Sequence, residues 1–487
     1  MRALGIALSG CVLVGCVSID PYRQQPVAQL LQHDDALGDC ARLFKASDAT
    51  IEAAGTRDAQ APRVAGFPYL RVDRSLALLA STAAVAEDPQ RAGEWMSALA
   101  ALDDGARRIE LRNAGGDTAA AADALAACRD VLARADQGRL AALLEAAQVP
   151  DDYSTAERIV GLYALTRYPF AAGIRRWQRE TLAEFAGAAP ASDPGSLPRL
   201  PYRPAARLDA VPSLPVAPLL GLPPIAQEEL AELIVRHAPR LAIATADDND
   251  RPGALVWQRD GDALRIGVAV DQALLYVRAA HTRIAGRWLL QLVYTAWFPA
   301  RPPAHAFDVL AGRLDGLLWR VTLTEDGAAL LYDSIHPCGC YHLFFPTERV
   351  RARPQPESID EGLFAPASVR SPADNERVVL WLAARTHYLQ RVAVERADAN
   401  GGVGVVMALR DDDQLRMLPL PDGGSRSAFD ADGLIAGSER LERFFFWPMG
   451  IASPGQMRQW GRHATAFVGR RHFDDPTLID RYFERLP

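Results

Sequence analysis

The sequence lacks the short motifs of common nucleotide-dependent and zinc-dependent enzymes. It contains no glycine-rich phosphate loop, no Gly-x-Ser-x-Gly nucleophile turn and no His-Glu-x-x-His pair. It also has no excess of basic side chains, because 53 lysines and arginines are outnumbered by 60 aspartates and glutamates, for a net charge of -7. A general nucleic-acid binder needs a basic face, so this balance argues against nucleic acid as a partner.

The apolar run at the N-terminus is short. Residues 1–15 hold one basic side chain, Arg2, and about a dozen apolar residues, too few to cross a bilayer as a stable helix. The run ends in Leu-Val-Gly-Cys at residues 13–16, which resembles the lipobox of bacterial lipoproteins. In that family a peptidase cuts before the cysteine, and lipid is attached to its sulfur. The alternative is an ordinary secretory signal followed by a coincidental cysteine.

This resemblance implies that Cys16 is lipidated and that the mature chain is anchored to a membrane through its N-terminus. In enterobacterial lipoproteins an aspartate after the cysteine means retention in the inner membrane, whereas this chain has Val17. The resemblance therefore implies an outer-membrane lipoprotein on the periplasmic side. Residues 1–15 would be the signal peptide and residues 16–32 a polar tether.

Cysteine is scarce, with six in 487 residues. The periplasm is oxidising, so paired cysteines there tend to form disulfides. Once lipid occupies Cys16, four mature cysteines remain, which allow three pairings. Cys40 and Cys128 are the only cysteines of the helical region, and we predict that they pair. Closing a loop of about ninety residues stabilises a fold by about 4 kcal/mol in the chain-entropy model.

The sequence pattern changes twice along the chain. Helical spacing and N-cap signals predict a helical domain over residues 33–188, including Asp88-Pro89 and a capping box that begins at Ser154. Proline recurs every few residues over 189–225, which predicts a stiff linker that resists helix and sheet. Residues 226–487 then alternate with period two. The fold class predicted is α+β: an N-terminal helical domain, a proline-rich linker and a C-terminal, mainly antiparallel sheet with flanking helices.

Individual strands and helices are predicted in the C-terminal region. Alternating apolar residues predict strands at 264–270, 273–278, 288–297, 317–324 and 328–333, with further strands at 378–382, 404–409 and 443–447. The strand at 288–297 is apolar on both faces, which indicates a central position in the sheet. Helix signals return at 454–467 and 477–485.

One cluster of chemically reactive residues stands out, because so many metal-ligating and nucleophilic side chains rarely occur together without a role. His336, Cys338, Cys340 and His342 lie within seven residues. On an extended strand all four would face one side, about 7 Å apart, which is too far to surround one ion. Pro337 disrupts a strand and Gly339 permits a bend, so we predict a kinked strand edge or turn that lets two or three of the four converge.

Several interpretations of this cluster compete. A Cys338–Cys340 disulfide would be a small strained ring with a redox role. A zinc or copper site formed by His336, Cys338, Cys340 and His342 is the second interpretation. A thiol nucleophile activated by a histidine is the third, and purely structural cysteines are the fourth. The functional hypothesis is an envelope enzyme or metal-binding protein that uses these four residues. The alternative is a non-catalytic envelope scaffold or binding lipoprotein with structural disulfides.

A second group of polar residues lies near the C-terminus. If that segment folds back on the cysteine cluster, His463, His472 or Arg471 could complete the site, as a base or as an anion-binding fork. The alternative for these residues is a solvated helix end. Asp315 and Asp333 are interpreted first as hairpin-turn and strand-end residues. Asp333 is also close enough in sequence to His336 to support it from behind, which is worth testing.

Overall fold

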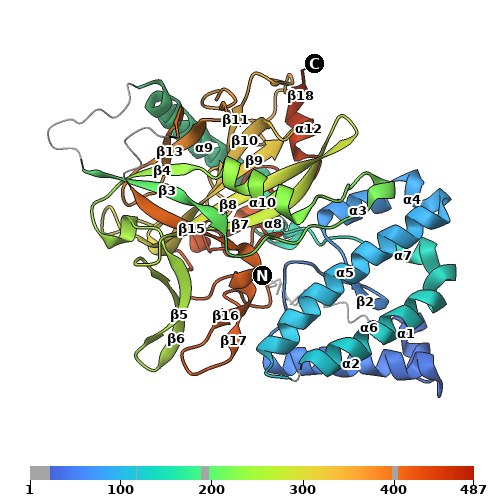
Figure 1. Cartoon of the computed structure of the whole chain (residues 1–487). Coiled ribbons are helices and arrows are strands. Elements are labelled where there is room, and N and C mark those ends of the chain that lie inside the picture. The colour runs from blue at the N-terminus through green and yellow to red at the C-terminus, as the bar shows by residue number, and fades with distance from the viewer. Residues whose placement is uncertain (1–21, 23, 117, 188–196, 398–403, 487) are drawn as a thin grey trace, which may run out of the picture.

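The computed structural model describes residues 22, 24–116, 118–187, 197–397 and 404–486. The predicted signal peptide, the lipobox and Cys16 lie outside these residues. Helices gather in the N-terminal part, and a large curled sheet fills the C-terminal part (Figure 1). The predicted α+β class is therefore confirmed.

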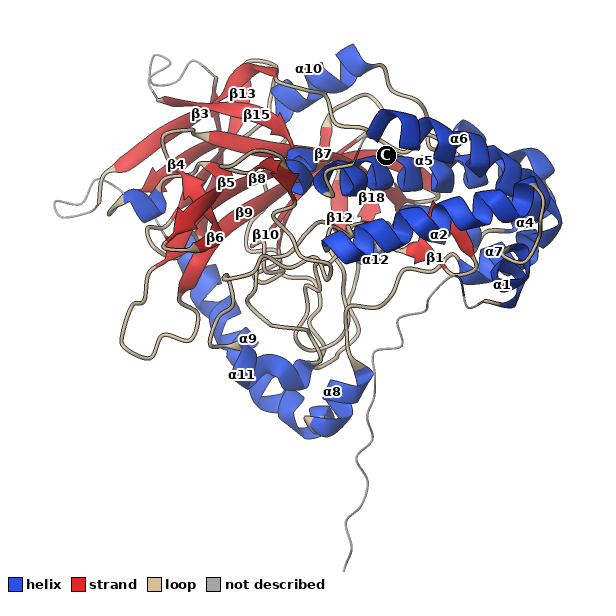
Figure 2. Ribbon diagram, turned by 90° about the horizontal axis from the view of Figure 1, so that it is seen from below, coloured by secondary structure: helices blue, strands red, loops and turns tan. Residues whose placement is uncertain are grey.

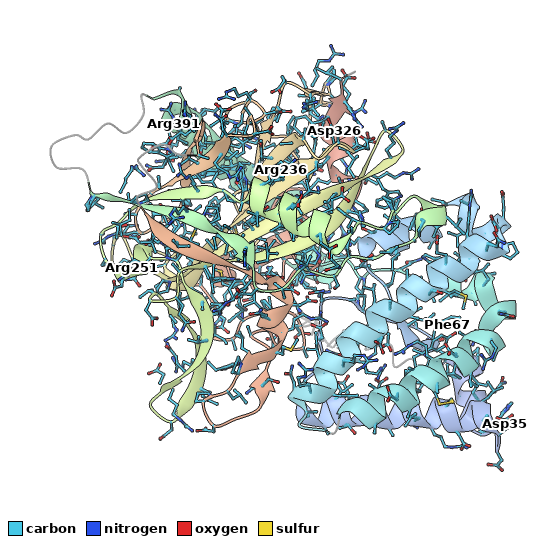
Figure 3. The ribbon with its side chains drawn as sticks, viewed as in Figure 1. Asp35, Phe67, Arg236, Arg251, Asp326 and Arg391 are labelled. Carbon is cyan, nitrogen blue, oxygen red and sulfur yellow. A yellow bond between two sulfur atoms is a disulfide. The ribbon has the colours of Figure 1, made fainter. Side chains whose placement is uncertain are left out.

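The N-terminal part is a helical bundle that encloses a small hairpin. Asp35 caps the second helix by accepting hydrogen bonds from the amides of Leu37 and Gly38, and it lies at the tip of the bundle, whereas the buried Phe67 of the hairpin lies among the helices (Figure 3). The predicted Asp88-Pro89 helix start is also present. The elements are α1 (Gln25–Leu30), α2 (Ala36–Ala54), β1 (Arg63–Val64), β2 (Phe67–Arg71), α3 (Arg74–Ala80), α4 (Ala83–Glu87), α5 (Pro89–Asn113), α6 (Thr118–Ala135), η2 (Asp136–Arg139) and α7 (Leu140–Ala146).

The predicted tether is shorter than expected. Residues 25–30 form α1, and Tyr22 is buried, with its hydroxyl donating to Asp48 Oδ2 at 2.7 Å. The prediction that the tether continues to residue 32 is therefore wrong for its described part.

Two further helices, α8 (Thr155–Val160) and α9 (Tyr163–Ala186), pack against the C-terminal part. The predicted cap of α8 is present, since Ser154 Oγ accepts from the amide of Glu157 at 3.2 Å. Arg158 Nε donates to the carbonyl of Met449 at 2.8 Å, and Trp177 of α9 lies 5.3 Å from the Tyr341 ring, centroid to centroid. Helices predicted as part of the helical domain therefore cover the sheet.

The main sheet has ten strands in the order β11-β10-β9-β8-β7-β15-β3-β4-β13-β14. Its pairings are antiparallel except for β13–β4, β15–β3 and β15–β7. The sheet curls so far that loops from its two ends touch. Tyr341 lies in the loop between β10 and β11, Tyr388 lies in the loop between β13 and β14, and their ring centroids are 4.7 Å apart. The strands are β3 (Arg199–Leu208), β4 (Arg240–Ala244), β7 (Leu274–Ile284), β8 (Arg287–Arg301), β9 (Gly312–Leu323), β10 (Ala329–Ile335), β11 (Leu343–Pro346), β13 (Glu376–Leu382), β14 (Leu389–Arg396) and β15 (Val405–Asp411).

Shorter elements surround this sheet. The helix α10 (Gln227–His237) lies over it, since the hydroxyl of Tyr294 in β8 donates to the carbonyl of Ile234 at 2.7 Å. The remaining elements are η3 (Pro218–Leu220), η4 (Asp248–Asp250), β5 (Ala254–Asp260), β6 (Ala263–Ala269), β12 (Val350–Ala352), η6 (Asp412–Met417), β16 (Leu418–Pro419), β17 (Ser425–Arg426), α11 (Arg443–Phe446), η7 (Trp447–Met449), α12 (Leu478–Tyr482) and β18 (Phe483–Arg485).

The proline-rich stretch is not only a linker. Residues 199–208 form β3, which lies between β15 and β4 inside the sheet. Pro201 and Pro204 donate no hydrogen bond, but the intervening Tyr202 is buried in the core and pairs with both neighbouring strands. Burial of such side chains outweighs the missing donors, so the prediction that this stretch avoids sheet is wrong.

Two local predictions near the C-terminus are also wrong. The segment 443–447, predicted as a strand, begins with the short helix α11. The segment 454–467, predicted as a helix, contains none, because Gly455 and Gly461 adopt φ values of +82° and +86° that interrupt a helix. The predicted helix at 477–485 is shortened to α12, and β18 follows it.

A buried carboxylate joins the bundle to the C-terminal part. Asp58 accepts hydrogen bonds from Arg416 at 2.6 Å and from Gln459 at 2.7 Å, and it is almost fully buried. Burial alone would raise its pKa, but the charges of Arg416 and Arg71 outweigh burial and lower it. Asp58 is therefore ionised, and its hydrogen bonds to Arg416 and Gln459 connect the bundle to the C-terminal part.

The predicted disulfide is present. Cys40 of α2 and Cys128 of α6 are bonded, with 5.0 Å between their Cα atoms and a sequence separation of 88. The bond joins two helices of the bundle, and the prediction is confirmed.

The double variant C40S/C128S should lose about 4 kcal/mol of unfolding free energy, because it frees a long loop in the unfolded chain. Urea titration followed by circular dichroism measures this loss. A reducing agent should destabilise the wild-type protein by a similar amount and leave the double variant unchanged. Equal stability of oxidised and reduced wild-type protein would contradict a stabilising role for this bond.

Candidate functional site

The cysteine and histidine cluster forms the loop between β10 and β11. The amide of His336 donates to the carbonyl of Cys340 at 3.0 Å, and the amide of Gly339 donates to the carbonyl of His336 at 2.8 Å. Gly339 has a φ of +88°, and a Cβ there would lie 2.3 Å from the carbonyl oxygen of Ala464. The bend expected at Pro337 and Gly339 is therefore present, and only glycine fits its tip.

The bend does not gather the four side chains around one point. His336 Nδ1 donates to Asp315 Oδ1 at 3.2 Å, whereas His342 Nε2 donates to Asp333 Oδ2 at 2.8 Å. Within the described ranges, no group of three or more His, Cys, Asp or Glu side chains is arranged to hold a metal ion. The zinc or copper centre predicted at His336, Cys338, Cys340 and His342 is therefore not formed, because the two histidines are bonded to different aspartates.

Cys338 and Cys340 are both free thiols, and both are buried. Burial alone would raise the pKa of Cys338, but a hydrogen bond from Cys340 and the charge of Arg440 outweigh burial and lower it. The same hydrogen bond, together with burial, raises the pKa of Cys340 well above its ordinary value. The two neighbouring histidines are bonded to aspartates, so the predicted activation of a thiol by a histidine has no support in these contacts.

Asp315 is the centre of a buried polar network. It lies near the start of β9 and is fully buried. Its Oδ1 accepts from His336 Nδ1 and from an Arg440 nitrogen, both at 3.2 Å, and its Oδ2 accepts from His387 Nδ1 at 2.9 Å. Burial alone would raise the pKa of Asp315, but Arg440 and the two imidazoles hold it well below its usual range. Asp315 is therefore a carboxylate.

His387 comes from the other end of the sheet, in the loop between β13 and β14. Its φ of +53° is strained for a non-glycine residue, and its ring stacks on Phe298 at 4.0 Å between centroids. Its Nε2 lies 3.4 Å from Asp250 Oδ1. Burial would lower the pKa of His387, but hydrogen bonds and charge from Asp250 and Asp315 raise it. His387 is therefore an imidazolium held between two carboxylates.

His336 differs in charge from His387. Burial lowers its pKa, and Asp315 offsets this only in part, so His336 is neutral near pH 7. Its Nδ1 is held by Asp315, and its ring lies edge-on to the rings of Tyr341 and Tyr388, with centroids at 5.0 and 5.7 Å. The neutral imidazole has a fixed orientation, and among the described residues its Nε2 has no hydrogen-bond partner.

A cavity of about 280 Å³ lies beside His336. It opens where β10 and β11 approach β14, and α9 covers it with Trp177, Glu180 and Glu184. Arg301 donates to the Tyr388 hydroxyl at 3.0 Å, which orients this side of the wall. The lining residues are Trp177, Glu180, Thr181, Glu184, Leu317, Ser334, His336, Tyr341, Leu343, Ala383, Thr386, Tyr388, Leu389 and Gln390.

This arrangement suits acid–base chemistry. A neutral imidazole can accept a proton from a molecule in the cavity, and the carboxylate behind it stabilises the resulting imidazolium. Neither His342 nor the two thiols line the cavity. Of the four predicted catalytic residues, only His336 does.

The C-terminal residues proposed to complete the site do not line the cavity either. The segment does fold back on the loop, since the amide of Arg458 donates to the carbonyl of Pro337 at 2.9 Å. His472 instead lies 3.3 Å from Asp151, and Arg471 donates to the carbonyl of Gly362 at 2.8 Å. His463 is fully buried, and burial lowers its pKa to about 3.

Sequence reasoning missed His387 and Arg440 and misjudged Asp315. The available signal for Asp315 was a carboxylate just before the apolar run at residues 317–319, since a carboxylate that is buried there must find polar partners. No local pattern marks His387, which is 72 residues away from the aspartate it contacts. Asp333, suggested as a partner for His336, pairs with His342 and Arg320.

No protein-family model, curated protein or solved structure matches this chain. Among the residues that the structure describes, no helix is long and apolar enough to cross a membrane.

Buried neutral histidines should make the protein lose stability in acid. Burial lowers the pKa of His342 to about 3 in the folded chain, despite its bond to Asp333, whereas an unfolded histidine titrates near 6.5. Below about pH 6.5 the unfolded chain therefore binds one more proton, and the unfolding free energy falls by about 1.4 kcal/mol per pH unit until about pH 3. The variant H342Q should lose this contribution in urea titrations between pH 7.5 and 5.

The exposed His305 provides a matched control for the loss of a histidine, as the variant H305Q. An equal change of slope in H342Q and H305Q would contradict the assignment of a neutral, buried His342.

Proposed function

We propose that this protein is an envelope enzyme in which His336 acts as general base and acid, oriented by Asp315. The observation that carries the proposal is a neutral imidazole, bonded to a buried carboxylate, in the wall of a cavity. A structural histidine needs partners but no cavity. A base needs both an orienting group and access to a substrate.

The surroundings of His336 support a small substrate. The cavity of about 280 Å³ is just below the usual volume range of ligand pockets. Trp177, Tyr341 and Tyr388 offer flat apolar faces. The covering helix α9 adds Glu180, which is paired with Arg176, and Glu184, which accepts a hydrogen bond from Gln390. A neutral or cationic molecule with a flat face and an exchangeable proton fits these walls. The proposed step is transfer of that proton to His336 Nε2.

The free thiols have no part in this proposal. Cys338 and Cys340 are buried away from the cavity. This leaves variants of both cysteines as matched controls for variants of His336.

Diethyl pyrocarbonate should modify His336 at least tenfold faster than His342, because the reagent attacks neutral imidazole nitrogens that it can reach. Peptide mapping by mass spectrometry measures both rates. In parallel, a panel of nitrophenyl esters, phosphates and glycosides is assayed with the wild-type protein and H336Q. Any turnover should fall by about 10²–10⁴-fold in H336Q and persist in C338S/C340S.

The variant D315N, checked by circular dichroism to be folded, tests the effect of the carboxylate on His336. Removing the carboxylate takes away the charge that raises the pKa of His336, so the pH profile of the turnover should move to lower pH. Equal modification rates of His336 and His342, or a turnover lost in C338S/C340S and retained in H336Q, would overturn the proposal.

We further propose that the protein is a lipoprotein anchored by Cys16 to the periplasmic side of the outer membrane. The leader and the Leu-Val-Gly-Cys sequence at residues 13–16 support this location. A disulfide between Cys40 and Cys128 is compatible with an oxidising compartment.

Labelling with an alkyne analogue of palmitate should mark the wild-type protein and not the variant C16S. Detection uses a clicked fluorophore after membrane fractionation. The variant C11S is the control, because Cys11 lies within the leader and should not affect labelling. Labelling of C16S at the wild-type level would refute the assignment of Cys16.

A further inference from the structure

A ridge of large apolar side chains is exposed on the α8, α9 and α11 side of the protein. Several of these side chains are among the most exposed of their kind, including Val160 at 74% and Leu165 at 67%. Single exposed apolar residues are common, but a contiguous group indicates an interaction surface. The apolar ridge consists of Ile159, Val160, Leu162, Leu165, Tyr168, Leu441, Phe444, Phe445 and Trp447.

The two segments of the apolar ridge lie side by side, although they are far apart in sequence. The rings of Phe170 and Phe446 meet edge to face at 5.2 Å, and the amide of Ser154 donates to the carbonyl of Gly450 at 2.6 Å. A Cβ at Gly161 would lie 2.6 Å from Pro448. Figure 2 shows α8, α9 and α11 together at the lower edge, away from the α1–α7 bundle.

The inner side of this region is well packed, so the outward side chains do not reflect a loose fold. Phe446 contacts both Phe170 and Phe467, at 5.2 and 5.4 Å between ring centroids. Met449 is fully buried. Neighbouring Phe444 and Phe445 point outward, with exposed fractions of 60% and 59%. The exposed side chains therefore belong to a surface that is well packed underneath.

Arginine side chains accompany the apolar ridge. Arg443 lies over the ring of Phe444 at 4.8 Å, and Arg167 lies over the ring of Tyr168 at 5.4 Å. The nearby Glu442 is buried, and burial raises its pKa to about 7. Outward aromatic and aliphatic side chains with interleaved arginines are typical of surfaces that lie in the head-group region of a bilayer with anionic lipid.

The position of the anchor favours the same occupant. Tyr22 is packed on the bundle, so the segment from Cys16 to Tyr22 extends about 20 Å at most. A lipid on Cys16 would hold the folded body close to a bilayer, so lipid would be a partner available to the apolar ridge.

We propose that the apolar ridge is a second membrane contact, which inserts into the head-group region of a bilayer that contains anionic phospholipid. The tether length supports this contact only if the proposed lipid anchor is correct, whereas the exposed side chains of the apolar ridge support it without the anchor. With the ridge embedded, α9 lies at the membrane surface, and the cavity that it covers is close to the lipid.

The test uses the chain from residue 16 onward with the substitution C16S, which keeps every described residue and carries no lipid. This protein is sedimented with vesicles of phosphatidylethanolamine and phosphatidylglycerol, and with vesicles of phosphatidylcholine alone. We expect binding to the anionic vesicles, weaker binding in high salt, and at least a tenfold loss of affinity in F444E/F445E.

A matched control comes from an exposed aromatic residue outside the apolar ridge. Phe307 is 86% exposed, so the variant F307E should bind vesicles like the parent protein. R443E should weaken binding to anionic vesicles only. Circular dichroism checks that each variant is folded, which is expected because the substituted side chains face outward.

No vesicle binding by the unlipidated protein, or an equal loss in F307E and F444E/F445E, would overturn the proposal. Self-association that is abolished in F444E/F445E without vesicle binding would make the ridge a protein interface and would also overturn it. Failure of the anchor is seen separately, as vesicle binding by the ridge combined with absent palmitate labelling of Cys16.

Discussion

The fold of the C-terminal part depends on one ionised carboxylate with almost no contact with water. An isolated charge in such a place is very costly, and Asp315 is tolerable only because two imidazoles and a guanidinium surround it. These partners come from the β10–β11 loop, from the β13–β14 loop and from Arg440. The carboxylate therefore holds both ends of the curled sheet together, and the cavity beside His336 exists because those ends meet.

The β10–β11 loop also shows how one local sequence can serve two purposes. His336 and His342 each bond a buried aspartate, but only His336 borders a cavity. Asp333 is shared with Arg320, which lies over the ring of Phe473 at 3.7 Å, so this second pair is enclosed by apolar packing. Burial sets both imidazoles neutral. The two imidazoles differ in whether another molecule can reach them from a cavity, and this depends on the tertiary structure.

Local patterns were sufficient for much of the fold. Asp88-Pro89 and the Ser154 cap are short-range signals, and the structure has both helix starts. The alternating strands from residue 264 to 333 were predicted well because half-buried strands repeat every two residues. Short aromatic runs such as 443–447 fit either a strand or a helix, and only tertiary packing decides between them.

The site was less predictable for a physical reason. A bend at Gly339 follows from residue type, whereas the destination of each side chain beyond the bend depends on strands that arrive from elsewhere. Asp315 and His387 are brought together by curling of the whole sheet, and curling has no signature in a single strand. Cys40 and Cys128 were the exception, because they are the only cysteines of the predicted helical domain, and this was enough to pair them.

The position of β3 inside the sheet has a consequence for folding while the chain is being synthesised. β15 joins β7 on one side to β3 on the other, and its partners lie about 130 and 200 residues earlier in the chain. Until residue 411 has been synthesised, the sheet exists as two halves with unpaired edges, which are prone to aggregate. The two halves of the sheet therefore stay unjoined until about five-sixths of the chain has been synthesised, and their edges need shielding until then.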